Sequence, residues 1–88
     1  MPKEELPEPL KVRLEAVEHA LGRPVIVRAA VWDDPALRGR LMRRAGALVL
    51  EYRDDGVGCF WRYDIIAELL DHVEQGHLEL DLRDEDLA

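Results

Sequence analysis

ALVLEYRDDGVGCFWRY, residues 47–63, is the stretch on which the predicted fold depends. Two β-prone runs flank Asp55 and Gly56, and an Asp-Gly pair between such runs is a strong signal for a two-residue hairpin turn. Because side chains alternate along a strand, that register places Cys59 opposite Tyr52 on the apolar face of the ribbon. We therefore expect an antiparallel hairpin in which the chain's only cysteine is a buried thiol that packs as a small hydrophobe.

Helical periodicity is clearest on either side of the middle of the chain. Residues 9–21 repeat apolar side chains at helical spacing, and Gly22 is suited to the left-handed conformation that ends a helix. A second apolar stripe follows Asp64, which we expect to cap its helix, and Gly76 ends that helix.

Two further segments are typical of strands. Residues 25–32 are rich in β-branched side chains and largely apolar on both faces, which favours a central position in the sheet. Residues 77–82 alternate leucine with polar side chains, which indicates a half-buried strand at an edge. Together with the hairpin, these two segments predict a sheet of about four strands.

Residues 35–45 have two interpretations. Asp34 followed by Pro35 is typical of a helix start, and leucines recur after them at helical spacing. Gly39 inside that helix weakens it by about 1 kcal/mol relative to alanine. The alternative is a short turn followed by a strand over residues 40–45. We favour the helix.

These elements predict an α+β domain with the order α-β-α-β-β-α-β. Helices packed on one face of a mixed, mostly antiparallel sheet of about four strands would bury the apolar faces of both. We expect residues 9–82 to form this single domain, residues 1–8 to be a flexible lead-in and residues 83–88 to be an acidic tail.

Charge and composition narrow the classes of function. The net charge of −7 divides into −2 for residues 1–10 (one Lys, three Glu), +3 for residues 11–62 (ten Lys and Arg, seven Asp and Glu) and −8 for residues 63–88 (one Arg, nine Asp and Glu). The chain has no serine, threonine or asparagine, which excludes a serine nucleophile and N-linked glycosylation.

The same composition bears on where the protein works. A single cysteine excludes a disulfide within the chain, and neither a signal peptide nor an apolar run of membrane-spanning length is present. We therefore expect a cytoplasmic protein without membrane contact. Its charged residues are almost entirely Arg, Glu and Asp, a composition that fits either a thermophile protein or a GC-rich genome.

Two charged segments are candidate contact surfaces. The first has four arginines in seven positions: Arg38, Arg40, Arg43 and Arg44. On the predicted helix the last three would group on one side, where guanidinium groups bind phosphates or carboxylates through forked hydrogen bonds. The second is an acidic surface for a basic partner, made of Glu68, Asp71, Glu74, Glu79 and Asp81.

The sequence predicts no catalytic site, no metal site and no cofactor. Cys59 has no histidine near it in sequence that would act as a base. Glu68, His72 and His77 are residue types that bind zinc, but they lack the spacing of a His-x-x-x-His or Glu-x-x-His pair. A glycine-rich phosphate loop is also absent from the sequence.

We therefore expect a small, non-enzymatic protein-interaction domain that serves as a regulatory or accessory subunit. Its basic middle and acidic end favour a homodimer in which the two segments meet. One alternative is nucleic-acid binding through the arginine-rich segment 38–44. A second alternative is an acidic inhibitor of a basic protein such as a nuclease.

Overall fold

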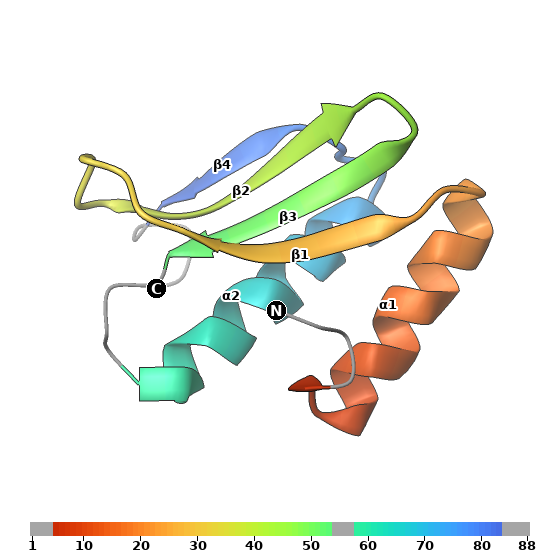
Figure 1. Ribbon diagram of the computed structural model, residues 1–88, viewed down its shortest axis with the longest axis horizontal. Helices are drawn as coiled ribbons and strands as arrows, with labels where there is room; N and C mark the ends of the chain where they lie inside the picture. The colour runs from red at the N-terminus through yellow and green to blue at the C-terminus, as the bar shows by residue number, and fades with distance from the viewer. Residues whose placement is uncertain (1–4, 54–57, 84–88) are drawn as a thin grey trace.

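A computed structural model describes residues 5–53 and 58–83, and the side chains of residues 58–61 lie outside that description. Both helices lie on one face of a four-stranded sheet, and no described element covers the other face (Figure 1). The elements are, in chain order, α1 (Glu8–Leu21), β1 (Val25–Ala30), β2 (Leu37–Arg44), β3 (Ala47–Arg53), α2 (Gly58–Glu74) and β4 (Leu80–Arg83).

The strands lie in the order β1-β3-β2-β4. Strand β1 is parallel to β3, whereas β2 is antiparallel to both β3 and β4. The predicted α+β class, the mixed sheet of four strands and the helices on one face are confirmed. The observed order of elements, α-β-β-β-α-β, differs from the predicted one. The edge position of β4 was predicted correctly, but the central position of β1 is wrong, because β1 forms the opposite edge.

The second strand of the predicted hairpin is wrong. Residues 58–63 form the first turns of α2, so Asp64 lies within the helix and does not cap it. Helical geometry lets Tyr63 pack against the core and places the Arg62 guanidinium 5.7 Å from the ring centre of Tyr52. These tertiary contacts outweigh the local β-propensity. The predicted turn and the Cys59 side chain lie outside the described residues.

The predicted helix over residues 35–45 is also wrong, and the strand alternative is closer to the structure. Leu37, Gly39 and Leu41 alternate toward the helices, as the period of two requires. Helix α2 crosses β2 so closely at Gly39 that a Cβ there would lie 2.8 Å from Cγ2 of Ile65. Gly39 would weaken the predicted helix, but in the strand its lack of a side chain lets α2 pack closely on β2.

The hydrophobic core lies between the sheet and the two helices. The predicted first helix is confirmed as α1, and Gly22 ends it with a φ of 67°. Leu6, from the predicted lead-in, is only 5% exposed and belongs to the core. Neither α1 nor α2, the two helices within the described ranges, is long and apolar enough to cross a membrane. The largest fully buried side chains are Leu14, Leu41, Leu48, Leu50, Ile65, Ile66, Leu69, Leu70 and Leu82, together with Val25 and Val49.

Candidate binding surface on the outer face of the sheet

The face of the sheet that points away from both helices is called the outer sheet face here, and the arginine-rich segment forms much of it. Because β2 is a strand, alternation places Arg38, Arg40 and Arg44 on this face. Arg43 lies on the opposite side of the strand, where its Nε donates to Oε1 of Glu79 at 3.0 Å. The predicted grouping of Arg40 with both Arg43 and Arg44 is therefore wrong.

A row of alternating charges crosses all four strands on the outer sheet face. The strand registers place Arg28, Glu51, Arg40 and Asp81 next to one another in that order. Nε of Arg28 lies 2.7 Å from Oε2 of Glu51, and Nε of Arg40 lies 3.5 Å from Oδ1 of Asp81. Glu51 is only 8% exposed, so its carboxylate is largely removed from water beside the Arg28 guanidinium group. Such cross-strand ion pairs stabilise the sheet and hold the arginines in place.

An apolar row runs beside the charged one. Ile26, Val49 and Met42 are paired across β1, β3 and β2. Val49 is 2% exposed although no described element covers this face, so neighbouring side chains must shield it. Long arginine and methionine side chains do this well, because their apolar stems lie along the sheet while the polar ends reach water. Ile26 remains 44% exposed, so the outer sheet face is partly apolar at its surface.

Trp32, just beyond β1, orders one end of this surface. Cζ of Arg40 lies 5.1 Å from the centre of the Trp32 ring, which is cation–π distance. The indole Nε1 donates to the carbonyl oxygen of Leu37 at 2.6 Å. Arg53 donates to the same carbonyl and to that of Asp34. Arg40 is thus held between an anchored ring and Asp81.

The segment between β1 and β2 is fastened to the last strand through Asp34. Nη1 of Arg83 lies 2.7 Å from Oδ2 of Asp34, and the backbone N–H of Ala36 donates to the other carboxylate oxygen at 3.1 Å. The hydrogen bond from Arg83, followed by that from Ala36, lowers the pKa of Asp34 below its ordinary value. The ionised Asp34 carboxylate therefore holds the segment between β1 and β2 against β4, and both of its oxygen atoms already have partners within this chain.

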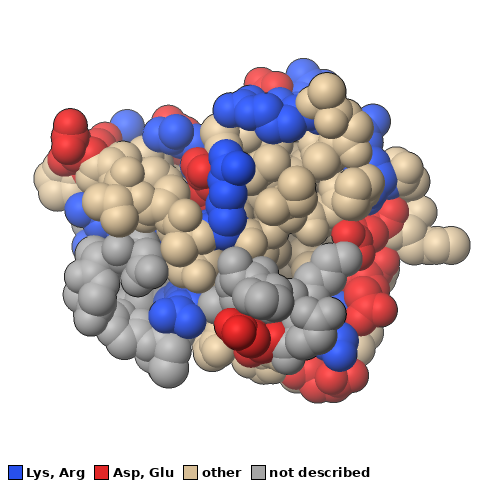
Figure 2. Space-filling model, viewed as in Figure 1, with Lys and Arg blue, Asp and Glu red and all other residues tan. Residues whose placement is uncertain are grey.

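Charge is divided between the two layers of the domain. The outer sheet face carries five arginines and two carboxylates, a balance of +3, whereas α1 and α2 carry seven acidic and three basic residues, a balance of −4. In Figure 2, Lys and Arg gather along the upper side, which is the side of the sheet, and Asp and Glu gather at the lower right, on the side of α1. The five arginines are Arg28, Arg38, Arg40, Arg44 and Arg53.

The predicted acidic surface does not form one continuous patch. Glu68, Asp71 and Glu74 belong to α2, whereas the other two acidic residues belong to β4 and the segment before it. Arg13 of α1 bridges Asp71 at 2.6 Å and Glu74 at 2.8 Å, and the hydrogen bond with Glu74 is the main cause of a raised Arg13 pKa. Together with the pairs described above, four of the five acidic residues bind arginines of this chain.

The residues considered for metal binding are brought together only in part. Nδ1 of His72 and Nδ1 of His77 lie 3.0 Å apart at the end of α2. Glu68 does not complete this pair, because the described residues contain no group of three His, Cys, Asp or Glu side chains that would hold a metal ion.

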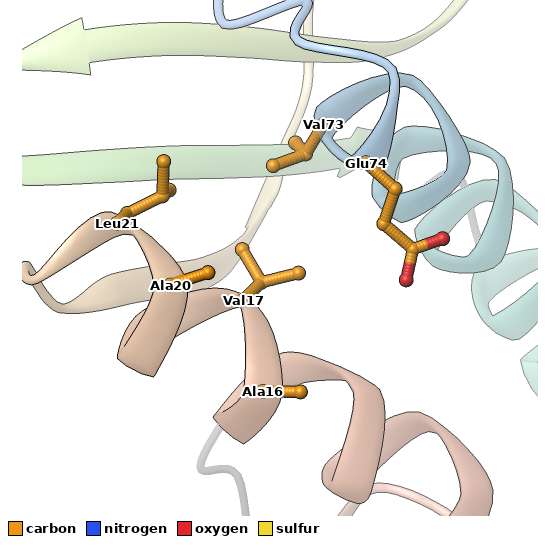
Figure 3. Close-up of a pocket in the computed structure, with 6 residues that line it drawn as sticks. All are labelled: Ala16, Val17, Ala20, Leu21, Val73 and Glu74. Carbon is orange, nitrogen blue, oxygen red and sulfur yellow. The ribbon is translucent and has the colours of Figure 1, made fainter.

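A groove lies between the two helices (Figure 3). Its volume is about 310 Å³, and its walls are apolar except for one carboxylate. It lacks the several converging polar groups that typify a catalytic pocket. The lining residues are Ala16, Val17, Ala20, Leu21, Val73 and Glu74.

Sequence reasoning missed several contributors to the outer sheet face, among them Ile26, Arg28 and Met42. The period of two in LRGRLMRR, residues 37–44, was the signal that places Met42 beside the arginines. Arg28 and Ile26 depend on β1 lying next to β3, which no local pattern indicates. No protein-family model, curated protein or solved structure matches the chain, so function is inferred from this surface.

Proposed function

We propose that this chain is a non-enzymatic protein-interaction domain, a cytoplasmic regulatory or accessory subunit that binds an acidic partner protein through the outer sheet face. One observation carries the proposal: the sheet has a whole face that no described element covers, and this face joins ordered arginines to exposed apolar side chains. A partner that covered this face would bury apolar surface and pair the arginines at the same time.

The residue types on this face favour a protein over a nucleic acid. Arginine, methionine and tryptophan are enriched at the centres of protein interfaces, whereas lysine is depleted there. The described strands contain five arginines on the outer face and no lysine. Single-stranded nucleic acids stack on free aromatic rings, but one face of the Trp32 ring is already occupied by Arg40.

The charge of the face indicates an acidic partner. Arg44 is exposed, and its described hydrogen bonds go to the carbonyl of Arg43 and the sulfur of Met42. The side chain of Arg28 is 50% exposed even though it is paired with Glu51. Carboxylates of a partner would therefore bind guanidinium groups that are already held in place and are still accessible. Arginines that lose water on binding are common hot spots of affinity.

The alternatives receive less support from the geometry. An acidic inhibitor would need a continuous acidic surface, but most of those carboxylates already bind this chain's arginines. A homodimer would bring the basic outer sheet face of one copy onto the acidic helices of another. Such a head-to-tail contact between opposite faces does not form a symmetric pair and would lead to rings or open chains of molecules.

The test compares two variants that remove the same amount of charge, one from the outer sheet face and one from outside it. Arg28→Ala with Arg44→Ala alters the outer sheet face, and Lys11→Ala with Arg23→Ala is the matched control. Tagged proteins capture partners from nuclease-treated lysate, and the affinity for the purified partner is then measured. We expect the control to bind within about twofold of the wild type and the sheet variant at least about tenfold more weakly.

Three results would overturn the proposal. The first is a partner that binds the sheet variant as tightly as the wild type. The second is recovery of nucleic acid with loss of all proteins on nuclease treatment, which would favour the nucleic-acid alternative. The third is light scattering that shows self-association abolished by the sheet variant, which would identify a second copy as the occupant.

A further inference from the structure

The end of α2 brings two histidine rings together at the surface. Gly76, with a φ of 91°, reverses the chain, and its N–H donates to the carbonyl of Val73 at 2.9 Å. The N–H of His77 donates to the carbonyl of His72, also at 2.9 Å. These two bonds form a Schellman motif, which fixes the backbone positions of both histidines. As a result, their Nδ1 atoms lie 3.0 Å apart and their ring centres 5.3 Å apart.

We propose that His72 and His77 form a binding site for one divalent transition-metal ion, held through both Nδ1 atoms. Imidazole nitrogen is a good ligand for Ni²⁺, Cu²⁺ and Zn²⁺. Metal–nitrogen bonds are about 2.0–2.1 Å long, so two bonds that span this separation meet at about 95°. That angle is close to the 90° between neighbouring ligands of a square-planar or octahedral ion and well below the tetrahedral angle of about 109° that zinc prefers. The site therefore suits Ni²⁺ and Cu²⁺ better than Zn²⁺.

The surroundings predict an open, reversible site. Within the described residues no third His, Cys, Asp or Glu joins the pair, so water would occupy the remaining positions of the ion. Without metal, one ring donates its Nδ1 proton to the other ring. When the ion binds, each neutral ring carries its proton on Nε2 and presents its Nδ1 lone pair to the metal. The ion would link the last turn of α2 to the segment that leads into β4.

The experiment is calorimetric titration of the full chain with Ni²⁺ and, separately, with Zn²⁺. His19, the third histidine, is exposed in the last turn of α1 and provides the matched control variant His19→Ala. We expect one Ni²⁺ per chain, tighter than Zn²⁺. His72→Ala and His77→Ala should each weaken Ni²⁺ binding at least about tenfold, whereas His19→Ala should change it less than about twofold. Cys59 is present in all four proteins, so any binding there is common to them.

Circular dichroism shows whether each variant keeps its helices, so a loss of binding is not confused with unfolding. Ni²⁺ should also raise the midpoint of thermal unfolding of the wild type and of His19→Ala, because it binds the folded chain preferentially. Equal Ni²⁺ affinity in the wild type and His77→Ala, or no Ni²⁺ binding to the wild type, would overturn the site. Tighter binding of Zn²⁺ than of Ni²⁺ would overturn the geometry assigned to it.

Discussion

Replacing Gly39 with alanine tests whether the close approach of α2 to β2 determines the residue at this position. The added Cβ would lie 2.8 Å from Cγ2 of Ile65, 3.2 Å from Cδ1 of Leu69 and 3.3 Å from the carbonyl oxygen of Glu51. Ile65 is 1% exposed and Leu69 is fully buried, so neither side chain has solvent into which it can move. The new methyl group must therefore displace packed atoms.

We expect Gly39→Ala to lower the free energy of unfolding by about 1–2 kcal/mol. Inserting a methyl group into a packed core costs about 1–3 kcal/mol. The lower entropy of alanine in the unfolded chain offsets about 0.4–1 kcal/mol of that cost. The contact with Ile65 determines the sign, because Cγ2 is attached directly to the β-carbon and cannot move away without rotation about χ1.

The assay is urea denaturation, followed by circular dichroism, of the wild type, Gly39→Ala, Ile65→Ala and the double variant. Ile65→Ala alone should cost about 2–5 kcal/mol, since it leaves a cavity. It also removes Cγ2, so Gly39→Ala should cost about 1 kcal/mol less in that background than in the wild type. Strictly additive effects, or a Gly39→Ala protein as stable as the wild type, would refute the argument.

Two further predictions concern charged residues. Arg28→Ala should lower the free energy of unfolding by about 1–3 kcal/mol, because it leaves the largely buried Glu51 carboxylate without its ion-pair partner. Glu51→Ala should cost less, no more than about 1 kcal/mol, because the Arg28 side chain that it releases is half exposed and can bind water. Denaturation curves of the two variants test this order, and equal costs would contradict it. Arg83 lowers the pKa of Asp34, so the contribution of this carboxylate to stability is complete above its unfolded pKa of about 3.9 and is lost as the pH falls through the lower folded value. Thermal unfolding of the wild type and Asp34→Asn should therefore differ near neutral pH and converge in acid, and a difference that is constant with pH would contradict this.

The parts of the fold that local chemistry determines could be predicted from the sequence. Helix α1 has an apolar stripe of one period, a proline at its start and Gly22 at its end, and all three signals agree. Nothing in the tertiary structure opposes them. Strand β4 could be predicted for the same reason. Its leucines, Leu80 and Leu82, alternate with polar residues, and this pattern fits only a strand with one buried face.

Strand β2 could not be predicted in this way, because its leucines fit two periods. Leu37 and Leu41 are four residues apart, and that spacing places them on the same side of a helix and also on the same side of a strand. The residue that separates the two possibilities is Gly39, whose need for space arises from α2. Glycine has no side chain that marks it as apolar, so the sequence pattern does not show that Gly39 faces the core. Its position becomes clear only from the helix that packs on it.

The start of α2 shows the same dependence on distant contacts. An Asp-Gly pair indicates a turn but not the element that follows it. The aromatic residues after it have high β-propensity, yet Tyr63 packs on the core from a helix and Arg62 reaches the ring of Tyr52 in β3. Propensity in a half-buried segment depends mainly on such packing.

The candidate surface was predicted in its composition but not in its arrangement. The arginines of residues 38–44 stood out in the sequence, and three of the four share a face in the structure. The row that holds them also needs Arg28 and Glu51, which meet only because β1 pairs with β3. Strand order is a property of the whole chain, so no local pattern reveals this row.

The separation of charge between the two layers has a consequence for the salt dependence of binding. Figure 1 is viewed down the shortest axis of the domain, and the sheet and the helices are stacked along the intermediate axis, which measures 24 Å. At about 0.15 M ionic strength the screening length is about 8 Å, so an acidic protein at the outer sheet face interacts with the arginines and hardly at all with the carboxylates behind them. At about 0.01 M the screening length is about 30 Å and exceeds the thickness of the domain, so the full charge of −7 repels the same partner. Affinity for an acidic partner should therefore pass through a maximum at intermediate salt. The salt concentration determines whether the partner interacts with the arginines of the sheet alone or with the charges of both layers.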